Sequence, residues 1–378
     1  MSRSLYYAAV YANDKEALEP YIKNIAKDAA DRIRRRELCL GRIIIRERID
    51  KTTGKIRQIG RETPMQQVFD HIAVGAASEI WNRRIVPQQA SSIKGRGQLY
   101  GTKIIRSWIQ KDNRCIKWAR AHHVRYTSKC RFFVKLDIKK CYPNARMEVF
   151  MRLFEKDCGN ADLIWLWREL LSSHRVDGYE GFLIGALPSQ WACQYLISFI
   201  YREAMSLAKI RRGKRVRLVT HALVYLDDIL LTGSSRRDLM IAIDRIVQFA
   251  REKFGFTIKP KWSIYELEKQ SIDMMGFVVH RNGSVSIRGR DFVHARRMIL
   301  RGSRQKSYSA RQAQRTCSYK GYFKNSDSRK FRQENNAEVL FDKAARVVSI
   351  TERRKNHDRQ LRFQAGNCAV HEAAQLAG

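Results

Sequence analysis

Tyr225-Leu226-Asp227-Asp228 is the stretch that decides the fold, because it sets two adjacent acids between two apolar segments, residues 221–224 and 229–232. Both segments are rich in aliphatic residues, which predicts a strand, a tight turn that carries the acids, and a returning strand. Burying strands beside two like charges costs free energy unless a cation neutralises them. Carboxylate oxygens suit Mg²⁺, so the hairpin indicates a divalent metal ion, although Asp is also common in solvated turns.

A third acid follows from an earlier stretch. Residues 131–137 read Arg-Phe-Phe-Val-Lys-Leu-Asp, an apolar segment that ends in Asp137. We predict a strand that places this acid beside the hairpin. Three carboxylates that converge there can hold two metal ions about 3.5–4 Å apart, the arrangement used for in-line attack on a phosphate.

The ordered set of segments resembles the reverse transcriptases. Their palm has a strand that ends in Asp, an aromatic residue five positions on, and a later Tyr-x-Asp-Asp hairpin. Further segments follow in the family's order: residues 55–59 resemble the basic fingers strand, 91–97 the loop after it, 259–261 the lysine motif and 274–277 the primer grip. The resemblance covers roughly residues 38–330. It implies an α+β, right-hand polymerase fold with fingers, a palm built on an antiparallel sheet, and a helical thumb.

The same resemblance sets the expected domains. We expect an N-terminal helical extension over 1–37, fingers over 38–130 and a palm over 131–288 with finger and palm insertions in 142–190. A helical thumb is expected over 289–349. Residues 350–378 are polar and are expected to form a C-terminal tail, either flexible or a contact segment.

One segment points to a subfamily. Residues 184–190 read Ile-Gly-Ala-Leu-Pro-Ser-Gln, where most bacterial reverse transcriptases have Gln-Gly-x-x-x-Ser-Pro. This signature is similar to the reverse transcriptases of diversity-generating retroelements. The resemblance implies copying of a template-repeat RNA into cDNA with errors at template adenines, for mutagenic retrohoming, and a small accessory variability protein oligomer as partner. Leu183 and Gln194 stand where proline and asparagine are usual, which leaves the shape of the nucleotide pocket open.

Two other functions stay open. One is an antiphage-defence or other orphan bacterial reverse transcriptase, and gene neighbourhood distinguishes it from the first. The other is a non-catalytic RNA-binding protein on a polymerase fold. The presence of all three acids argues against this function.

The resemblance also implies catalytic roles. Asp137 and Asp227 are expected to bridge two Mg²⁺ ions, which Mn²⁺ can replace, with the Ile138 carbonyl as a further oxygen ligand and Asp228 as an outer ligand. Such ions lower the pKa of the primer 3′-hydroxyl. Lys261 is expected as the general acid for the departing pyrophosphate. Lys259 is the alternative, and a phosphate-positioning role is equally open.

The nucleotide pocket and the nucleic-acid contacts follow in the same way. Tyr142 would exclude a 2′-hydroxyl, or else be a core tyrosine. Lys55 and Arg57 would hold the triphosphate, or else lie on a solvated strand. The expected dNTP-binding set is completed by Ile184, Gly185 and Gln190, whose alternative is core packing. Contacts to template and primer are expected from Lys94, Arg96, Met275, Gly276, Phe277, Arg296 and Arg297. Residues 275–277 are a hydrophobic run, so plain core packing is equally open for them.

The composition agrees with a nucleic-acid partner. The 378 residues include 73 Lys+Arg against 37 Asp+Glu, a formal net charge of +36. A charge this large makes a polyanion the expected partner, here a template RNA and an RNA/cDNA duplex together with dNTPs. Binding should weaken steeply with salt, because each neutralised phosphate releases counterions.

The eight cysteines form no Cys-x-x-Cys pair, which argues against a zinc module and fits a reducing cytoplasm. We find neither a signal peptide nor an apolar run long enough for a bilayer, so we expect a cytoplasmic protein with no membrane partner.

Overall fold

The structure is a computed structural model of the chain. It describes residues 15–49, 54, 56–176, 181–305 and 307–375, although the side chains of Lys15, Ala17 and residues 358–375 lie outside the description. The chain divides into two compact units. The larger is Glu37–Ser286, and the smaller joins Met1–Arg36 to Ile287–Gly378.

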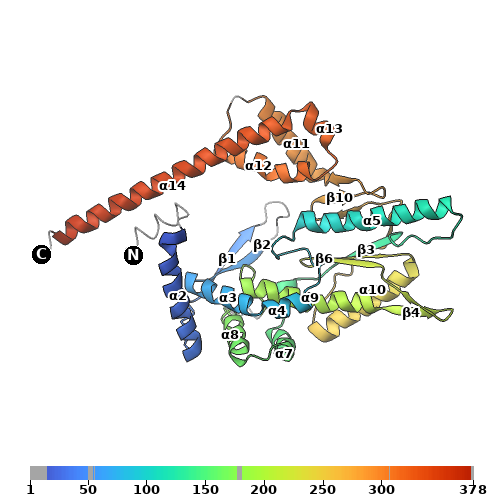
Figure 1. Cartoon of the computed structure of the whole chain (residues 1–378), viewed down its shortest axis with the longest axis horizontal. Coiled ribbons are helices and arrows are strands. Elements are labelled where there is room, and N and C mark those ends of the chain that lie inside the picture. The colour runs from blue at the N-terminus through green and yellow to red at the C-terminus, as the bar shows by residue number, and fades with distance from the viewer. Residues whose placement is uncertain (1–14, 50–53, 55, 177–180, 306, 376–378) are drawn as a thin grey trace. The chain divides into compact units, whose positions relative to one another are not determined.

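A four-stranded antiparallel sheet in the order β6-β7-β3-β8 lies in the larger unit. Figure 1 labels two of its strands, β3 and β6. Its strands are β3 (Phe132–Asp137), β6 (His221–Tyr225), β7 (Asp228–Gly233) and β8 (Tyr265–Glu266). β7 is buried from Ile229 to Gly233 because both of its neighbours are apolar strands. The strand, turn and returning strand expected over 221–232 are confirmed, as is the α+β class.

Two helices pack on the sheet. Helix α9 (Leu187–Ser206) contacts β6, and α10 (Arg236–Phe254) contacts β7. α9 is apolar on most faces and is buried through most of residues 188–200. α10 begins at Ser235, whose side chain accepts from the Asp238 N–H, and ends at Gly255 in the left-handed region. These ends fix where the chain leaves the sheet and where it returns toward Asp137.

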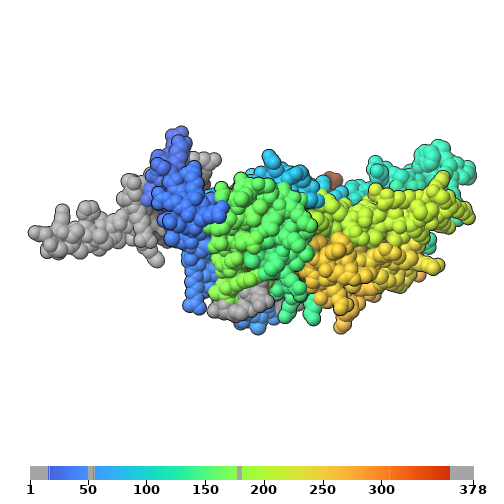
Figure 2. Space-filling model, turned by 90° about the horizontal axis from the view of Figure 1, so that it is seen from below, coloured from blue at the N-terminus to red at the C-terminus, as the bar shows by residue number. Residues whose placement is uncertain are grey.

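An aromatic cluster joins α9 to the helices behind it, which are α3 (Pro64–Ala76), α4 (Ser78–Arg84), α7 (Met147–Asp157) and α8 (Ala161–Ser172). The Trp81 ring lies 5.4 Å from Trp167 and 5.9 Å from Tyr195, edge to face in both cases. Figure 2 shows the outer surface of this unit, where the green segment around α7 and α8 adjoins the gold segment around α10. The cluster thereby anchors the first half of α9, in which Tyr195 lies.

The remaining elements of the larger unit are short hairpins and one long helix. β1 (Ile44–Ile49) pairs with β2 (Ile56–Arg61), and β4 (Ala208–Arg211) pairs with β5 (Lys214–Arg217). β9 (Ile272–Met274), β10 (Phe277–Val279) and β11 (Val285–Ile287) form a small sheet. The long helix is α5 (Gln98–Ala121), and a single turn, α6 (Cys141–Asn144), follows β3.

The smaller unit is helical. It contains α2 (Lys15–Arg35), α11 (Gly289–Ser303), α12 (Ala310–Lys324), α13 (Arg329–Glu334) and α14 (Ala337–Gln375). Ala295, Ile299, Phe323 and Phe341 are among the residues that form its core. α14 runs across residue 350, where a tail was expected to begin. The sequence after 350 has no glycine before Gly366 and no proline, and its Glu, Arg, Lys and Gln residues favour helix.

None of the helices within the described ranges has an apolar stretch of the length that crossing a membrane requires.

Candidate active site

The three predicted acids meet at the ends of two neighbouring strands. In the antiparallel pairing of β3 with β7, Asp137 lies directly opposite Asp228. The Ile138 N–H donates to the Asp227 carbonyl at 3.0 Å, which fixes the acidic turn against the end of β3. Side chains opposite each other in such a ladder have Cβ atoms about 4.5–5.5 Å apart. The register thus places Asp137 beside Asp228, and the backbone bond of Ile138 places the turn residue Asp227 next to them.

These acids destabilise one another's charges. Burial raises the pKa of Asp228 to about 6, and the charges of Asp227 and Asp137 add to the effect. Burial also raises the pKa of Asp227, with a further contribution from Asp137. The charges of Lys259 and Arg57 oppose this rise. Three partly buried acids that repel one another are the environment that a divalent cation relieves.

A second observation bears on the fit of a metal. The Oδ1 atom of Asp137 is buried and accepts no hydrogen bond from the described residues, whereas its Oδ2 atom accepts from Lys259 Nζ at 2.6 Å. Within the described ranges, no three His, Cys, Asp or Glu side chains form a ready-made metal-binding group. The lysine ammonium supplies the positive charge at Asp137 instead. The orphaned carboxylate oxygen and the two neighbouring acids are donors of the kind that Mg²⁺ binds, so these residues fit such an ion.

The backbone beside Asp137 is held by the segment after α10. Lys259 N–H donates to the Asp137 carbonyl at 2.9 Å, and Lys139 N–H donates to the Thr257 carbonyl at 2.8 Å. Ile138 lies opposite Ile258 between these two bonds, and its own carbonyl takes part in neither. Ile138 is thus placed beside the acids with its carbonyl oxygen outside this ladder.

Of the two candidate lysines, the structure brings Lys259 to the acids. Lys261 is exposed. On a regular strand, residues 259 and 261 would point their side chains to the same side. Here Trp262 N–H donates to the Pro260 carbonyl at 3.0 Å, which makes a tight turn and ends the strand alternation. The side chains of Lys259 and Lys261 therefore do not share one side.

Tyr142 and Arg57 also lie within the electrostatic reach of Asp227. Burial raises the pKa of the Tyr142 hydroxyl, and the charges of Cys193, Cys141 and Asp227 add to it. Arg57 is an exposed residue of β2 whose charge lowers the pKa of Asp227. Lys55, which was predicted beside it, lies outside the described residues.

The segment that carries the subfamily signature lies against β2. Gly60 N–H donates to the Ile184 carbonyl at 2.9 Å, and Ile59 lies opposite Ile184 as a parallel bridge. Gly185 has φ +112°, and a Cβ there would lie 2.9 Å from the Gly60 carbonyl oxygen, so only glycine suits this position. Ile184 and Gln190 are half-buried, the latter in the first turn of α9. The backbone of residues 184–185 is thus paired with β2 along Ile59 and Gly60.

The predicted template and primer residues differ in exposure and fall into three kinds. Lys94 on its loop and Arg296 and Arg297 on α11 are exposed. Arg96 is half-buried and donates to the Val86 carbonyl at 2.8 Å, which gives it a structural partner. Met275, Gly276 and Phe277 are buried at the β9–β10 turn. A Cβ added to Gly101 of α5 would lie 2.5 Å from the Met275 sulfur, so this turn packs tightly on α5.

A buried polar network behind the signature was not predicted. His174 Nε2 lies 3.1 Å from Glu62 Oε1, and its Nδ1 lies 3.2 Å from the hydroxyl of Ser189, the serine of the signature. All three residues are buried, and Asp70 lies next to Glu62. The network ties the start of α9 to the end of β2. Its members are far apart in the sequence, so no local sequence pattern predicts the network.

Asp70 in this network makes stability depend on pH. Burial, and then the charge of Glu62, raises the Asp70 pKa from 3.8 to about 9. A raised carboxyl pKa contributes stability below the unfolded value that is lost as pH rises toward the folded value. We therefore expect Asp70→Asn to unfold at a higher temperature than wild type at pH 8 but not at pH 5. The difference should grow by at most about 1.4 kcal/mol per pH unit. Thermal melts at both pH values measure it. For the exposed Asp244→Asn, the difference in unfolding temperature from wild type should be the same at both pH values. The same result for Asp70→Asn would contradict the prediction.

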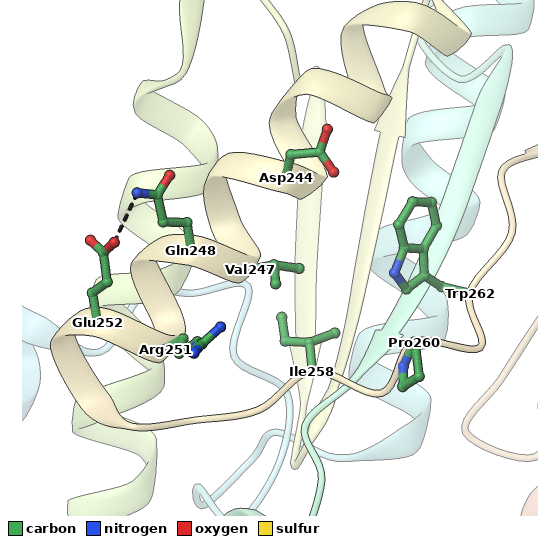
Figure 3. Close-up of a pocket in the computed structure, with 8 residues that line it drawn as sticks. All are labelled: Asp244, Val247, Gln248, Arg251, Glu252, Ile258, Pro260 and Trp262. Atoms are coloured by element: carbon green, nitrogen blue, oxygen red, sulfur yellow. Dashed lines mark hydrogen bonds between the residues drawn. The ribbon is translucent and has the colours of Figure 1, made fainter.

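A separate hollow of about 630 Å³ lies between α10 and the segment 258–262 that follows it (Figure 3). Val247 of α10, Ile258, Pro260 and Trp262 form its apolar part, and Asp244, Gln248, Arg251 and Glu252 its polar part. Gln248 donates to Glu252 at 2.8 Å. Ile258 lines this hollow, whereas the side chain of Lys259 next to it reaches Asp137.

The chain shares features with known proteins. Residues 49–279 match the family model described as reverse transcriptase (RNA-dependent DNA polymerase). Among solved structures, telomerase from Candida albicans in complex with a fragment of telomeric RNA is similar at 11% identity and a TM-score of 0.44, over 81% of this chain and 61% of that one. Apo telomerase from Candida tropicalis is similar at 12% identity and a TM-score of 0.45, over 93% and 73% of the two chains. The chain thus spans less than two thirds of the Candida albicans protein. No curated protein sequence matches the chain significantly.

Proposed function

The chain belongs to the reverse transcriptase (RNA-dependent DNA polymerase) family, and we propose that it copies an RNA template into cDNA by nucleotidyl transfer at Asp137, Asp227 and Asp228. The observation that carries the proposal is the strand register that sets Asp137 opposite Asp228, with Asp227 bonded to the next residue, Ile138.

Reverse transcriptases generally use divalent metal ions. Here Asp137 and Asp227 would hold two Mg²⁺ ions, with Asp228 and the Ile138 carbonyl as further ligands and Mn²⁺ as a substitute. Bound ions of this kind lower the pKa of the attacking hydroxyl and neutralise charge on the leaving pyrophosphate. The raised pKa of Asp228, about 6, means that the site becomes fully anionic only above that pH, unless a cation is bound.

The chain's own cations would complete the chemistry. Lys259 lies at the acids and carries a proton that it can give to the departing pyrophosphate. Lys261, the residue favoured by the sequence, would contact phosphate from its exposed position. Arg57, together with Lys55 two positions before it in the sequence, would hold the triphosphate, because the charge of Arg57 already acts on Asp227.

Residues of each unit would contact the nucleic acid. We assign fingers to 38–130, palm to 131–288 and thumb to 289–349. Lys94 and the exposed Arg296 and Arg297 would contact phosphates. Met275, Gly276 and Phe277 would support the primer through their tight turn, and Arg96 through the loop that it holds.

Tyr142 would select the sugar. Its half-buried ring lies within electrostatic reach of Asp227 and would clash with a 2′-hydroxyl on the incoming nucleotide. We expect Tyr142→Ala to raise the ratio of kcat/KM for rNTP to that for dNTP by about 10- to 100-fold, the range of steric discrimination in a pocket. Single-nucleotide extension with each substrate measures the ratio. Tyr142→Phe, which keeps the ring, should leave it unchanged. An unchanged ratio in the alanine variant would place Tyr142 in the core alone.

Primer extension on an RNA template tests the proposed activity. Wild type should extend a DNA primer with dNTPs and Mg²⁺, and Asp227→Ala/Asp228→Ala should not. If wild type binds the primer–template but neither Mg²⁺ nor Mn²⁺ supports extension, the chain is an RNA-binding protein on a polymerase fold.

We further propose that the enzyme serves a diversity-generating retroelement, on the strength of residues 184–190. Its template would be a template-repeat RNA, copied with errors at adenines, and its partner a small accessory variability protein oligomer. The position of Ile184 beside β2 supports the proposal, because an aliphatic side chain there would supply no hydrogen bond to a template base. Fewer polar contacts at the base pair loosen discrimination.

Ile184→Gln tests this link directly. The amide would restore a polar contact, and we expect misincorporation opposite template adenine to fall several-fold, by about 1 kcal/mol of discrimination, with errors at other bases unchanged. Sequencing of cDNA from a defined RNA template measures both rates. Ile184→Leu is the matched control and should keep the wild-type spectrum. If the adenine error rate is the same in all three proteins, Ile184 has no part in fidelity.

A further inference from the structure

The loop before α5 runs alongside strand β6. Val224 N–H donates to the Gln88 carbonyl and Ala90 N–H donates to the Val224 carbonyl, both at 2.9 Å. This pairing extends the sheet by a short segment that belongs to no named strand. Ser91 is the next residue, so it arrives beside the acidic turn.

Ser91 holds the backbone of that turn. Its hydroxyl is buried and accepts a hydrogen bond from Leu226 N–H at 2.8 Å. Leu226 has φ +56°, in the left-handed region that residues other than glycine rarely adopt. Leu226 immediately precedes Asp227, so its conformation sets the direction of both acids of the hairpin. An unusual conformation of this kind persists only where its surroundings fix it.

Two glutamines hold Ser91 in turn. Gln194 Nε2 donates to the Ser91 hydroxyl at 2.7 Å, and Gln89 Nε2 donates to Gln194 Oε1 at 2.8 Å. Val86 N–H donates to Gln89 Oε1 at 3.0 Å. Because a backbone N–H can only donate, it fixes the orientation of the first amide and, through it, of the second. Gln89, Gln194 and Ser91 are all buried, so each bond of this chain is shielded from water.

We propose that Ser91 is a positioning residue for catalysis, which holds Leu226 in the left-handed conformation and thereby sets the direction of Asp227 and Asp228, the residues that would hold the metal ions. Gln194 and Gln89 orient its hydroxyl. The proposal rests on the proposed polymerase function. It also explains Gln194, which stands where the family usually has asparagine, because the longer side chain spans from Gln89 to Ser91.

Steady-state primer extension with Ser91→Ala tests the proposal. We expect kcat to fall about tenfold, as for one lost buried hydrogen bond, with the KM for dNTP within about twofold of wild type. The Mg²⁺ concentration for half-maximal rate should rise several-fold. Ser91→Thr restores the hydroxyl and should recover at least half of the lost rate. Ser107→Ala, which removes an exposed hydroxyl from α5, is the matched control and should behave as wild type.

A second measurement does not depend on activity. Amide hydrogen exchange of the peptide that contains residues 225–228 should be faster in Ser91→Ala and Gln194→Ala than in wild type and Ser107→Ala. If wild type fails to extend a primer, the polymerase function fails, while the exchange result still decides the role of Ser91. The inference is overturned if exchange of this peptide is unchanged in Ser91→Ala. It is also overturned if Ser91→Ala loses rate, KM and melting temperature together and Ser91→Thr recovers none of them, because that marks a general loss of the fold.

Discussion

Replacing Asp137 by asparagine is expected to lower kcat for primer extension by about a thousandfold, since the loss of about 4 kcal/mol of metal-assisted stabilisation corresponds to that factor. Asparagine keeps the shape of the side chain and removes its charge. Asp137 faces Asp228 across the sheet, and its Oδ1 atom accepts no hydrogen bond within the described part of the chain. This oxygen is therefore the one that we expect a metal ion to bind.

The same substitution should leave the fold intact, because it removes the ion pair with Lys259 and at the same time the repulsion among the acids. Asp137 raises the pKa of both Asp227 and Asp228, so its neutralisation relieves repulsion in the metal-free protein. Single-turnover extension measures the rate, and a thermal melt in EDTA measures the stability. Asp244→Asn on the exposed face of α10 is the control and should match wild type in both. A variant at Asp137 that keeps more than about a tenth of the wild-type rate would contradict the role assigned here.

The second large effect is expected at Lys259. We expect Lys259→Ala to lower kcat by about a hundredfold, the usual contribution of a positioned general acid, and Lys261→Ala to lower it less than about threefold. The two lysines differ in place, because Lys259 reaches Asp137 Oδ2 at 2.6 Å and Lys261 is exposed. Extension assays under single-turnover conditions compare the two variants.

The pH dependence provides an independent check on Lys259. Its charge lowers the pKa of Asp227 and Asp228, so its removal should raise both values. A raised carboxyl pKa delays formation of the anionic site, and the acid limb of the rate profile should therefore move to higher pH in Lys259→Ala. Lys261→Ala should keep the wild-type profile. The assignment to Lys259 fails if Lys261→Ala loses more activity, or if the acid limb stays in place in both variants.

The strands that carry the acids could be predicted from sequence because their signals are local. An apolar run that ends in Asp137, and two such runs around residues 225–228, define strands, a turn and their direction by alternation and burial. The register of Asp137 with Asp228 then follows from two antiparallel strands that end at the same edge.

The supporting residues could not be predicted because their partners are distant in the chain. Ser91 meets Leu226 and Gln194, and Glu62 meets His174, each more than 100 positions apart. The sequence around a single serine or histidine does not indicate which distant residue it hydrogen-bonds. The choice between Lys259 and Lys261 depended on one backbone turn at Pro260, which strand alternation does not reveal. The course of α14 through residue 350 could not be predicted either, because polar composition alone does not distinguish a helix from irregular chain.

Metal-directed backbone cleavage tests the central claim most directly, that Asp137 and the 227/228 pair jointly bind divalent cations. Fe²⁺ in place of Mg²⁺, with ascorbate and peroxide, cuts a chain close to the bound metal. Wild type should be cut both near residue 137 and near residues 227–228, excess Mg²⁺ should suppress both cuts, and Asp137→Asn should lose both together. Cuts elsewhere, or a cut at the 227–228 turn that persists unchanged in Asp137→Asn, would contradict a shared metal site.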